Sequence, residues 1–477
     1  MYKSLSIIQA ALAANQTSCE ALVQDYIARI EANKHLNCFL ETYNEDALAQ
    51  AKVVDEKLKN GTAKRLAGAV IAIKDVLCYK GHKVSASSKI LQGFESLYTA
   101  TAVQHLIDED AIIIGRTNCD EFAMGSSNEN SAYGKVLNAA DNTKVPGGSS
   151  GGAAVVVQAN LCLASLGTDT GGSIRQPASF CGIVGVKPTY GRISRYGLLA
   201  YASSFDQIGV FAHNAIDAGL VMEIMSGADK NDSTCSLKKV ESFTSTDIDI
   251  SKIKIAYLPS VMDSAGLDVE IKQRTMDILQ ILKLNGATIG TENFDKLDYL
   301  IPTYYVLTTA EASSNLSRYD GVRYGYRSPN ATDLESVYKK SRAEGFGKEV
   351  KRRIMLGTFV LSEGFYDAYY SKAQKVRRMV TNEMNQLFDE YDFLITPTTP
   401  TTAFGFGDKK DPIAMYLNDI YTVLANIAGI PGISLPLGMH SNGMPFGFQI
   451  MSKKFSEQKL MAFSNWCMNS IQTNQKN

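Results

Sequence analysis

The chain has 477 residues, 45% of them apolar and 20% charged, so it can bury a large core and is neither disordered nor fibrous. Its formal net charge is -1, whereas a chain that binds a nucleic-acid phosphate backbone by itself is usually basic. The eight cysteines show no Cys-x-x-Cys pair or zinc-ligand spacing. They predict reduced thiols and no metal site. A cytoplasmic location is expected because the N-terminal segment matches a secretory signal poorly. No apolar run approaches the ~18 residues that span a bilayer, so we expect no membrane association.

Residues 1–61 predict a helical flank. Residues 4–14 favour a short amphipathic helix over a secretory signal, because the apolar stretch is brief and interrupted by Gln9. Thr17 or Ser18 can cap a second helix, and residues 44–60 predict a third that ends before a glycine.

From residue 62 to 215, short β-branched runs alternate with helical or glycine-rich segments. Strands are predicted at residues 70–73, 111–114, 183–186 and 208–211. After a polar surface connection at 229–251, the alternation resumes with strands at 253–258 and 393–395 and helices at 269–284, within 304–378 and at 416–428. Strands separated by helices predict an α/β sheet. We therefore predict one α/β domain, with a catalytic core segment at 62–215 and the rest of the sheet and the pocket helices at 252–477.

Two glycine-rich motifs and one lysine hold the candidate catalytic residues. Ser149 lies in Pro-Gly-Gly-Ser-Ser-Gly-Gly, Ser173 lies in Gly-Thr-Asp-Thr-Gly-Gly-Ser-Ile-Arg, and Lys74 ends an apolar run. A serine nucleophile needs a base, and none of the five histidines lies in these motifs. Lysine can act as a base only where burial lowers its pKa from ~10.4 toward neutrality. The alternative is a strand-end lysine whose amine reaches solvent.

The second glycine-rich motif also predicts an oxyanion hole. Its glycines let the main chain approach a substrate closely, so several amides can converge on one developing negative oxygen. The candidate donors are the amides of Thr170, Gly171, Gly172 and Ser173. Taken alone, the first motif could instead cradle a phosphate, although it lacks the Gly-Lys-Ser/Thr end of a P-loop. A catalytically silent scaffold that binds an anion therefore remains an alternative.

Together the motifs closely resemble those of the amidase signature family. The resemblance implies a single large α/β domain with a mixed central sheet covered by helices. It also implies that Ser173 is the nucleophile, that Ser149 relays the proton beside a cis peptide bond, and that Lys74 is the base. Asp169 is expected to brace the loop rather than to react. One small departure is Ala153, where many members carry a further serine.

Within that family, the resemblance extends over nearly the whole chain to the A subunits of glutamyl-tRNA(Gln) amidotransferases. The segments that carry it are residues 122–127, 310–316, 319–325, 353–358, 364–370 and the helix around 418–419. It implies a glutaminase that supplies ammonia for converting Glu-tRNA(Gln) to Gln-tRNA(Gln). Free glutamine carries both an ammonium and a carboxylate, so its pocket needs a basic and an acidic side chain.

The resemblance assigns the α-carboxylate of glutamine to Arg353 and the α-ammonium to Asp419. Met124, Gly125 and Ser126 would line the pocket, and one of Tyr304 and Tyr305 would close it. No cofactor is expected in this chain. The resemblance also implies two partner subunits, which form a heterotrimer with this chain. The B subunit would bind the tRNA and use ATP and magnesium, and a small C subunit would bridge the two larger chains. The alternative that shares the catalytic core is a stand-alone amidase acting on a small or acyl amide.

Overall fold

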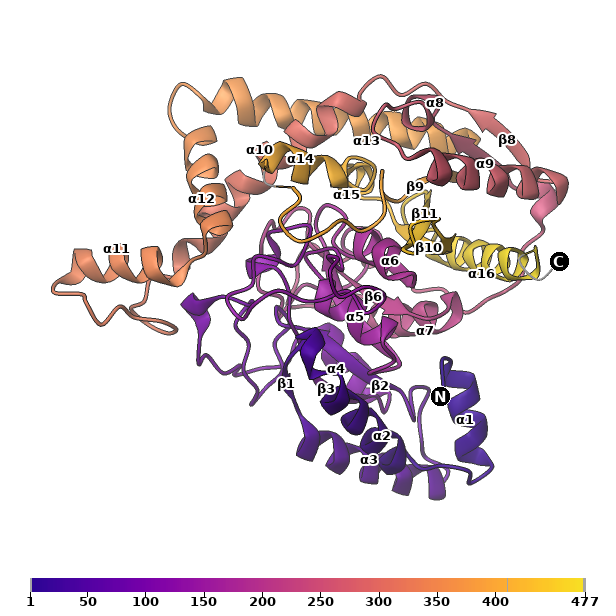
Figure 1. Ribbon diagram of the computed structural model, residues 1–477, viewed down its shortest axis with the longest axis horizontal. Helices are drawn as coiled ribbons and strands as arrows, with labels where there is room; N and C mark the ends of the chain where they lie inside the picture. Colours follow the sequence, from indigo (N-terminus) through magenta and orange to yellow (C-terminus); the bar gives the residue numbers. More distant parts are fainter. Residues whose placement is uncertain (1, 410, 475–477) are drawn as a thin grey trace.

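A computed structural model describes residues 2–409 and 411–474. Its centre is an 11-stranded sheet that draws on both halves of the chain (Figure 1). In sheet order the strands are β1 (Phe39–Thr42), β3 (Ile112–Thr117), β2 (Val70–Lys74), β4 (Ala164–Asp169), β6 (Gln207–Ala212), β5 (Val184–Lys187), β10 (Gly432–Met439), β11 (Pro445–Ser452), β9 (Phe393–Pro397), β7 (Lys254–Tyr257) and β8 (Thr288–Thr291). Strand β5 pairs with β10, which joins the early and late strands into one sheet.

The sheet is mixed, as the resemblance implied. Strand β2 runs parallel to β3 and β4, and β7 runs parallel to β8 and β9, whereas the other pairs are antiparallel. Every residue of β2, β3 and β4 is buried. Parallel strands covered on both faces are typical of α/β proteins. The predicted fold class, a single α/β domain with a mixed sheet covered by helices, is confirmed.

Helices cover both faces of the sheet, and α11 projects from the body of the molecule (Figure 1). They are α1 (Leu5–Ala13), α2 (Cys19–Ala32), α3 (Asn44–Lys59), α4 (Thr101–Asp108), α5 (Gly151–Gln158), α6 (Arg175–Cys181), α7 (Ala215–Met225), α8 (Pro259–Met262), α9 (Val269–Leu284), α10 (Leu297–Asn315), α11 (Leu334–Gly345), α12 (Lys348–Val360), α13 (Lys372–Glu390), α14 (Pro412–Tyr416), α15 (Val423–Ala428) and α16 (Glu457–Asn474). Among the described residues, no helix is long and apolar enough to cross a membrane.

The N-terminal flank is helical as predicted, with one exception. Helices α1, α2 and α3 form, and the Ser18 side chain accepts a hydrogen bond from the Ala21 amide at the start of α2. Residues 39–42, however, form the edge strand β1 and pair with β3. Four half-buried residues carry too little periodicity to predict a strand, and the pairing with β3 decides their conformation.

The predicted strands form within one or two residues of their expected bounds, except that β3 continues three residues past residue 114, and β4, β8, β10 and β11 were not predicted. Strand β4 contains Gly167 and is buried on both faces, so it shows no alternation of apolar and polar residues. The predicted helix at 416–428 is broken: a short 3-10 helix, η7 (Leu417–Asp419), precedes α15. All eight cysteines are free thiols, as expected.

Candidate active site

Lys74 ends β2 between the two parallel neighbours of that strand, and its side chain is fully buried. Its Nζ donates hydrogen bonds to three hydroxyls, Ser149 Oγ at 2.8 Å, Ser150 Oγ at 2.9 Å and Thr168 Oγ1 at 2.8 Å. Burial lowers the pKa of the Lys74 amine to about 8. The alternative of a solvent-reaching lysine is therefore wrong.

Ser149 lies in the loop that leads into α5. The peptide bond between Gly148 and Ser149 is cis, as the resemblance implied. The glycines here have a steric role: a Cβ on Gly148 would stand 2.1 Å from Asp120 Oδ2. The Gly148 amide donates to Gln176 Oε1 at 3.0 Å, which ties this loop to α6. Contacts with Gln176 and Asp120 therefore hold the main chain that places Ser149 beside Lys74.

Ser173 lies in the turn between β4 and α6, and the residue is 9% exposed. It makes no hydrogen bond with Ser149 or Lys74 in the described part of the chain. The amide of Gly172 donates to Asp169 Oδ1 at 2.8 Å, so this candidate oxyanion donor is already occupied. Within residues 2–409 and 411–474, the amides of Thr170, Gly171 and Ser173 donate to no acceptor.

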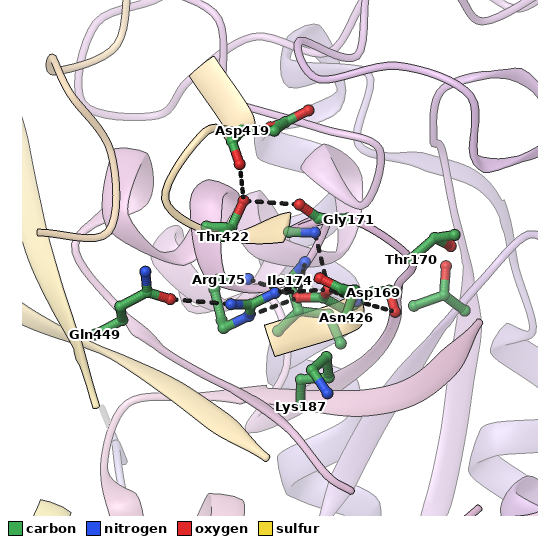
Figure 2. A network of polar contacts seen from close by, with 12 residues as sticks. Asp169, Thr170, Gly171, Ile174, Arg175, Lys187, Asp419, Thr422, Asn426 and Gln449 are labelled. Carbon is green, nitrogen blue, oxygen red and sulfur yellow. Dashed lines mark hydrogen bonds and ion pairs between the residues drawn. The ribbon is translucent and has the colours of Figure 1, made fainter. Parts of the chain in front are cut away.

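Asp169 is the centre of a buried network behind that turn (Figure 2). Its carboxylate accepts hydrogen bonds from Arg175 Nε at 3.1 Å and from Asn426 Nδ2 at 2.9 Å. Burial opposes ionisation, but the Arg175 guanidinium outweighs it and holds the pKa of Asp169 at about 2. Thr422 Oγ1 donates to the Gly171 carbonyl at 2.7 Å and fixes the turn from the other side. This geometry agrees with the expected bracing role of Asp169.

The predicted acidic group of the pocket, Asp419, lies in η7 and is buried. Its Oδ2 accepts a hydrogen bond from Ser126 Oγ at 2.6 Å, and burial raises its pKa to about 7. Met124 and Ser126 are buried in the same loop as Gly125. A Cβ on residue 125 would lie 2.3 Å from the Asp120 carboxyl carbon, so only glycine fits at this position.

The predicted basic group, Arg353, lies on α12 and is also buried. Its Nε donates to Glu349 Oε1 at 2.9 Å, and its Nη1 donates to the Tyr201 hydroxyl at 2.9 Å. The guanidinium carbon stands 5.2 Å from the centre of the Tyr305 ring. A cleft of about 230 Å³ opens beside it, with Gly125, Ser127, Glu349, Arg353, Lys409 and Tyr416 among its lining residues.

The two predicted tyrosines take different positions. Tyr305 stacks on Tyr416 with ring centres 3.8 Å apart, beside Arg353. Tyr304 instead packs under the nucleophile turn, because a Cβ on Gly171 would stand 2.5 Å from its ring. The structure thus brings Tyr305 to the basic group of the pocket and Tyr304 to the candidate oxyanion donors.

Comparisons with known proteins agree with this geometry. A family model described as Amidase matches residues 21–461. The chain belongs to the amidase family. This amidase is 48% identical over 474 residues to the A subunit of glutamyl-tRNA(Gln) amidotransferase from Chlorobium phaeobacteroides, covering 98% of this chain and 99% of the relative. It is 50% identical over 455 residues to the protein of the same name from Acidobacterium capsulatum, covering 94% and 95%.

Solved structures of two relatives share the fold. The A subunit of glutamyl-tRNA(Gln) amidotransferase from Thermotoga maritima superposes with a TM-score of 0.76 at 38% identity, covering 93% of this chain and 90% of that one. A native peptide amidase from Stenotrophomonas maltophilia has a TM-score of 0.82 at 26% identity, covering 97% and 96%. The amidase fold is therefore shared by relatives whose names describe different substrates.

Sequence reasoning missed several side chains of this site. Ser150 and Thr168 stand beside predicted residues inside the two motifs, so their contact with the amine could have been suspected. Glu349 is four positions before Arg353 on one helix, a spacing that predicts contact. Tyr201 lies far from the other pocket residues in the sequence, and no pattern marks it.

Proposed function

We propose that this amidase is the glutamine-hydrolysing subunit of a tRNA-dependent amidotransferase. The observation that carries the proposal is a pair of buried basic and acidic side chains: Arg353, whose guanidinium carbon lies 5.2 Å from the centre of the Tyr305 ring, and Asp419, which accepts a hydrogen bond from Ser126 Oγ at 2.6 Å. A substrate with one carboxylate and one ammonium complements such a pair. Relatives that are 48% and 50% identical over nearly the full length bear the name of that enzyme's A subunit.

Hydrolysis begins when neutral Lys74 accepts a proton from Ser149 while Ser149 accepts the proton of Ser173. The Ser173 oxygen then attacks the side-chain carboxamide carbon of glutamine and forms a tetrahedral oxyanion. The amides of Thr170, Gly171 and Ser173 supply hydrogen bonds to that oxyanion, each worth on the order of 3 kcal/mol. The amide of Gly172 instead holds Asp169 and keeps the turn in place.

Collapse of the intermediate breaks the carbon-nitrogen bond. The proton held by Lys74 returns through Ser149 to the departing nitrogen, which leaves as ammonia, and a glutamyl ester remains on Ser173. Water then attacks the ester with the same chain of groups as base, and this step releases glutamate. Ammonia is the product that the amidotransferase uses.

In substrate recognition, Arg353 binds the α-carboxylate of glutamine and Asp419 binds its α-ammonium. Met124, Gly125 and Ser126 form the wall opposite α12, and Tyr305 packs beside the carboxylate. Removing either charged partner leaves the substrate with a desolvated, unpaired charge, so each of the two groups selects for a free amino acid.

Two companion chains complete the reaction. The B subunit holds the tRNA and uses ATP and magnesium to activate the misacylated glutamate, and the C subunit joins the two larger chains. The formal net charge of -1 supports an assignment in which tRNA is held mainly by the B subunit. Among the described residues, no group of three or more histidine, cysteine, aspartate or glutamate side chains could hold a metal ion.

The test is to co-express the chain with its two companions and to measure glutamate release and amidation of Glu-tRNA(Gln). We expect both activities to require Ser173, and we expect Arg353→Ala to abolish glutamine hydrolysis at ordinary substrate concentrations. An enzyme that hydrolyses apolar amides without regard to Arg353, and that never amidates tRNA, would be a stand-alone amidase. Absence of labelling by a serine-directed electrophile at any pH would instead support a silent scaffold.

A further inference from the structure

One short loop contacts both the substrate anchor and the nucleophile turn. The hydroxyl of Tyr201 accepts a hydrogen bond from Arg353 Nη1 at 2.9 Å, and its main-chain amide donates to Asp206 Oδ2 at 2.9 Å. Asp206 Oδ1 in turn accepts a hydrogen bond from Thr170 Oγ1 at 2.7 Å. Thr170 begins the turn that carries Ser173. The loop therefore forms a continuous link from the anchor to the nucleophile.

The direction of the hydrogen bonds at the Tyr201 hydroxyl follows from its neighbours. Thr308 Oγ1 donates its proton to the Tyr304 carbonyl at 2.8 Å, because a carbonyl can only accept. Thr308 must then accept the proton of Tyr201, whose oxygen lies 2.9 Å away. The lone pairs of the Tyr201 oxygen are left for Arg353. Thr308 on α10 thus orients the Tyr201 hydroxyl so that its oxygen accepts a hydrogen bond from Arg353.

Arg353 is held on two of its three nitrogens. Its Nε donates to Glu349 and its Nη1 donates to Tyr201, while Nη2 donates no hydrogen bond to a described residue. Because the guanidinium is planar and rigid, two fixed nitrogens determine where the third one lies. The position at which a substrate carboxylate binds is therefore set in part by Tyr201.

We propose that Tyr201 is a positioning residue that fixes the distance between Arg353 and the turn bearing Ser173, and that it thereby selects glutamine over the shorter asparagine. The inference rests on the proposed function. The two amides differ by one methylene, which a site with fixed ends can discriminate by roughly 10- to 200-fold. A site in which one end is free to move adapts to both lengths and loses that discrimination.

The experiment compares the unchanged complex with Tyr201→Phe, using glutamine, asparagine and 4-aminobutanamide, which is glutamine without its α-carboxylate. We expect the KM for glutamine to rise roughly tenfold with little change in kcat, because the lost bond is made to a charged group. The preference for glutamine over asparagine in kcat/KM should fall by a similar factor. Hydrolysis of 4-aminobutanamide should be unchanged, since it does not use Arg353.

Thr308→Val provides a second variant, because it removes the acceptor that orients Tyr201 without touching Arg353. It should shift the KM for glutamine in the same direction by a smaller factor. Tyr338→Phe is the matched control, since Tyr338 is 40% exposed on α11. An equal loss of kcat/KM on all three amides, or an unchanged KM for glutamine, would overturn the proposal. An unchanged complex that hydrolyses 4-aminobutanamide but not glutamine would instead overturn the proposed function.

Discussion

The nucleophile side and the recognition side of this site satisfy their buried charges differently. On the nucleophile side, Asp169 is paired with Arg175, and the Lys74 amine is surrounded by three hydroxyls. On the recognition side, Arg353 and Arg352 share the single carboxylate of Glu349, and the Ser126 hydroxyl is the only described group that donates a hydrogen bond to the Asp419 carboxylate.

This difference separates the residues expected to act in catalysis from those expected to bind the substrate. A catalytic group must already be in place when the substrate arrives, so its partners belong to the protein. A recognition group binds best where the ligand supplies a missing partner, because an unpaired buried charge is unfavourable until it is matched. Breaking the first region should therefore affect kcat or stability, and breaking the second should affect KM.

The largest effect is expected from Ser173→Ala, which removes the proposed nucleophile. Glutamine hydrolysis should fall at least ~10⁴-fold, since comparable serine enzymes lose ~10⁶-fold in kcat. Glutamate release by the purified complex measures the loss, and circular dichroism checks the fold. Ser362→Ala on an exposed turn is the control. Residual activity within a hundredfold of the unchanged enzyme would exclude Ser173 as the nucleophile.

The next test concerns the charge of Lys74. Its pKa is lowered to about 8, so the amine is protonated, and unable to accept the relayed proton, below that pH. The kcat/KM for glutamine should therefore fall tenfold per pH unit as the pH decreases below about 8. Lys74→Arg keeps the side chain charged and should be inactive across the range. A pH profile that stays flat down to pH 5 would argue against a lysine base.

Asp169→Asn should affect stability more than chemistry. It leaves the fully buried Arg175 without its counter-ion, which costs about 3–5 kcal/mol of unfolding free energy. Because the folded pKa of Asp169 is about 2, below its ordinary value, its stabilisation is complete above pH 4 and is lost as the pH falls toward 2. Urea denaturation at several pH values measures both effects. An unchanged denaturation midpoint at pH 7 would contradict the bracing role.

The smallest effect is expected from Asp419→Asn on the recognition side. The variant keeps the shape of the side chain but removes the carboxylate that we propose binds the α-ammonium, so the KM for glutamine should rise roughly 30-fold. The kcat should change little, and the denaturation midpoint should stay the same or rise, because a buried charge is removed. Steady-state kinetics on glutamine separate the two constants. A fall in kcat with an unchanged KM would place Asp419 on the catalytic side instead.

The nucleophile side could be predicted from the sequence more completely than the recognition side. Ser149, Ser173 and Asp169 lie in two glycine-rich motifs, and the apolar run before Lys74 indicates burial of its amine. Arg353 and Asp419 carry no local pattern, and only the resemblance to a known family pointed to them. The predicted use of Gly172 as an oxyanion donor overlooked that Asp169, three residues earlier, accepts its amide.

By itself the sequence determined the N-terminal helices, six of the eleven strands that the structure describes, and the residues that can carry out the chemistry. These properties are local, because they depend on periodicity and side-chain type. Only the tertiary structure decided that Tyr201 meets Arg353, that Ser126 meets Asp419, and that residues 39–42 join the sheet. Contacts between segments far apart in the chain depend on how the whole sheet and its helices pack, and no short window of sequence contains that information.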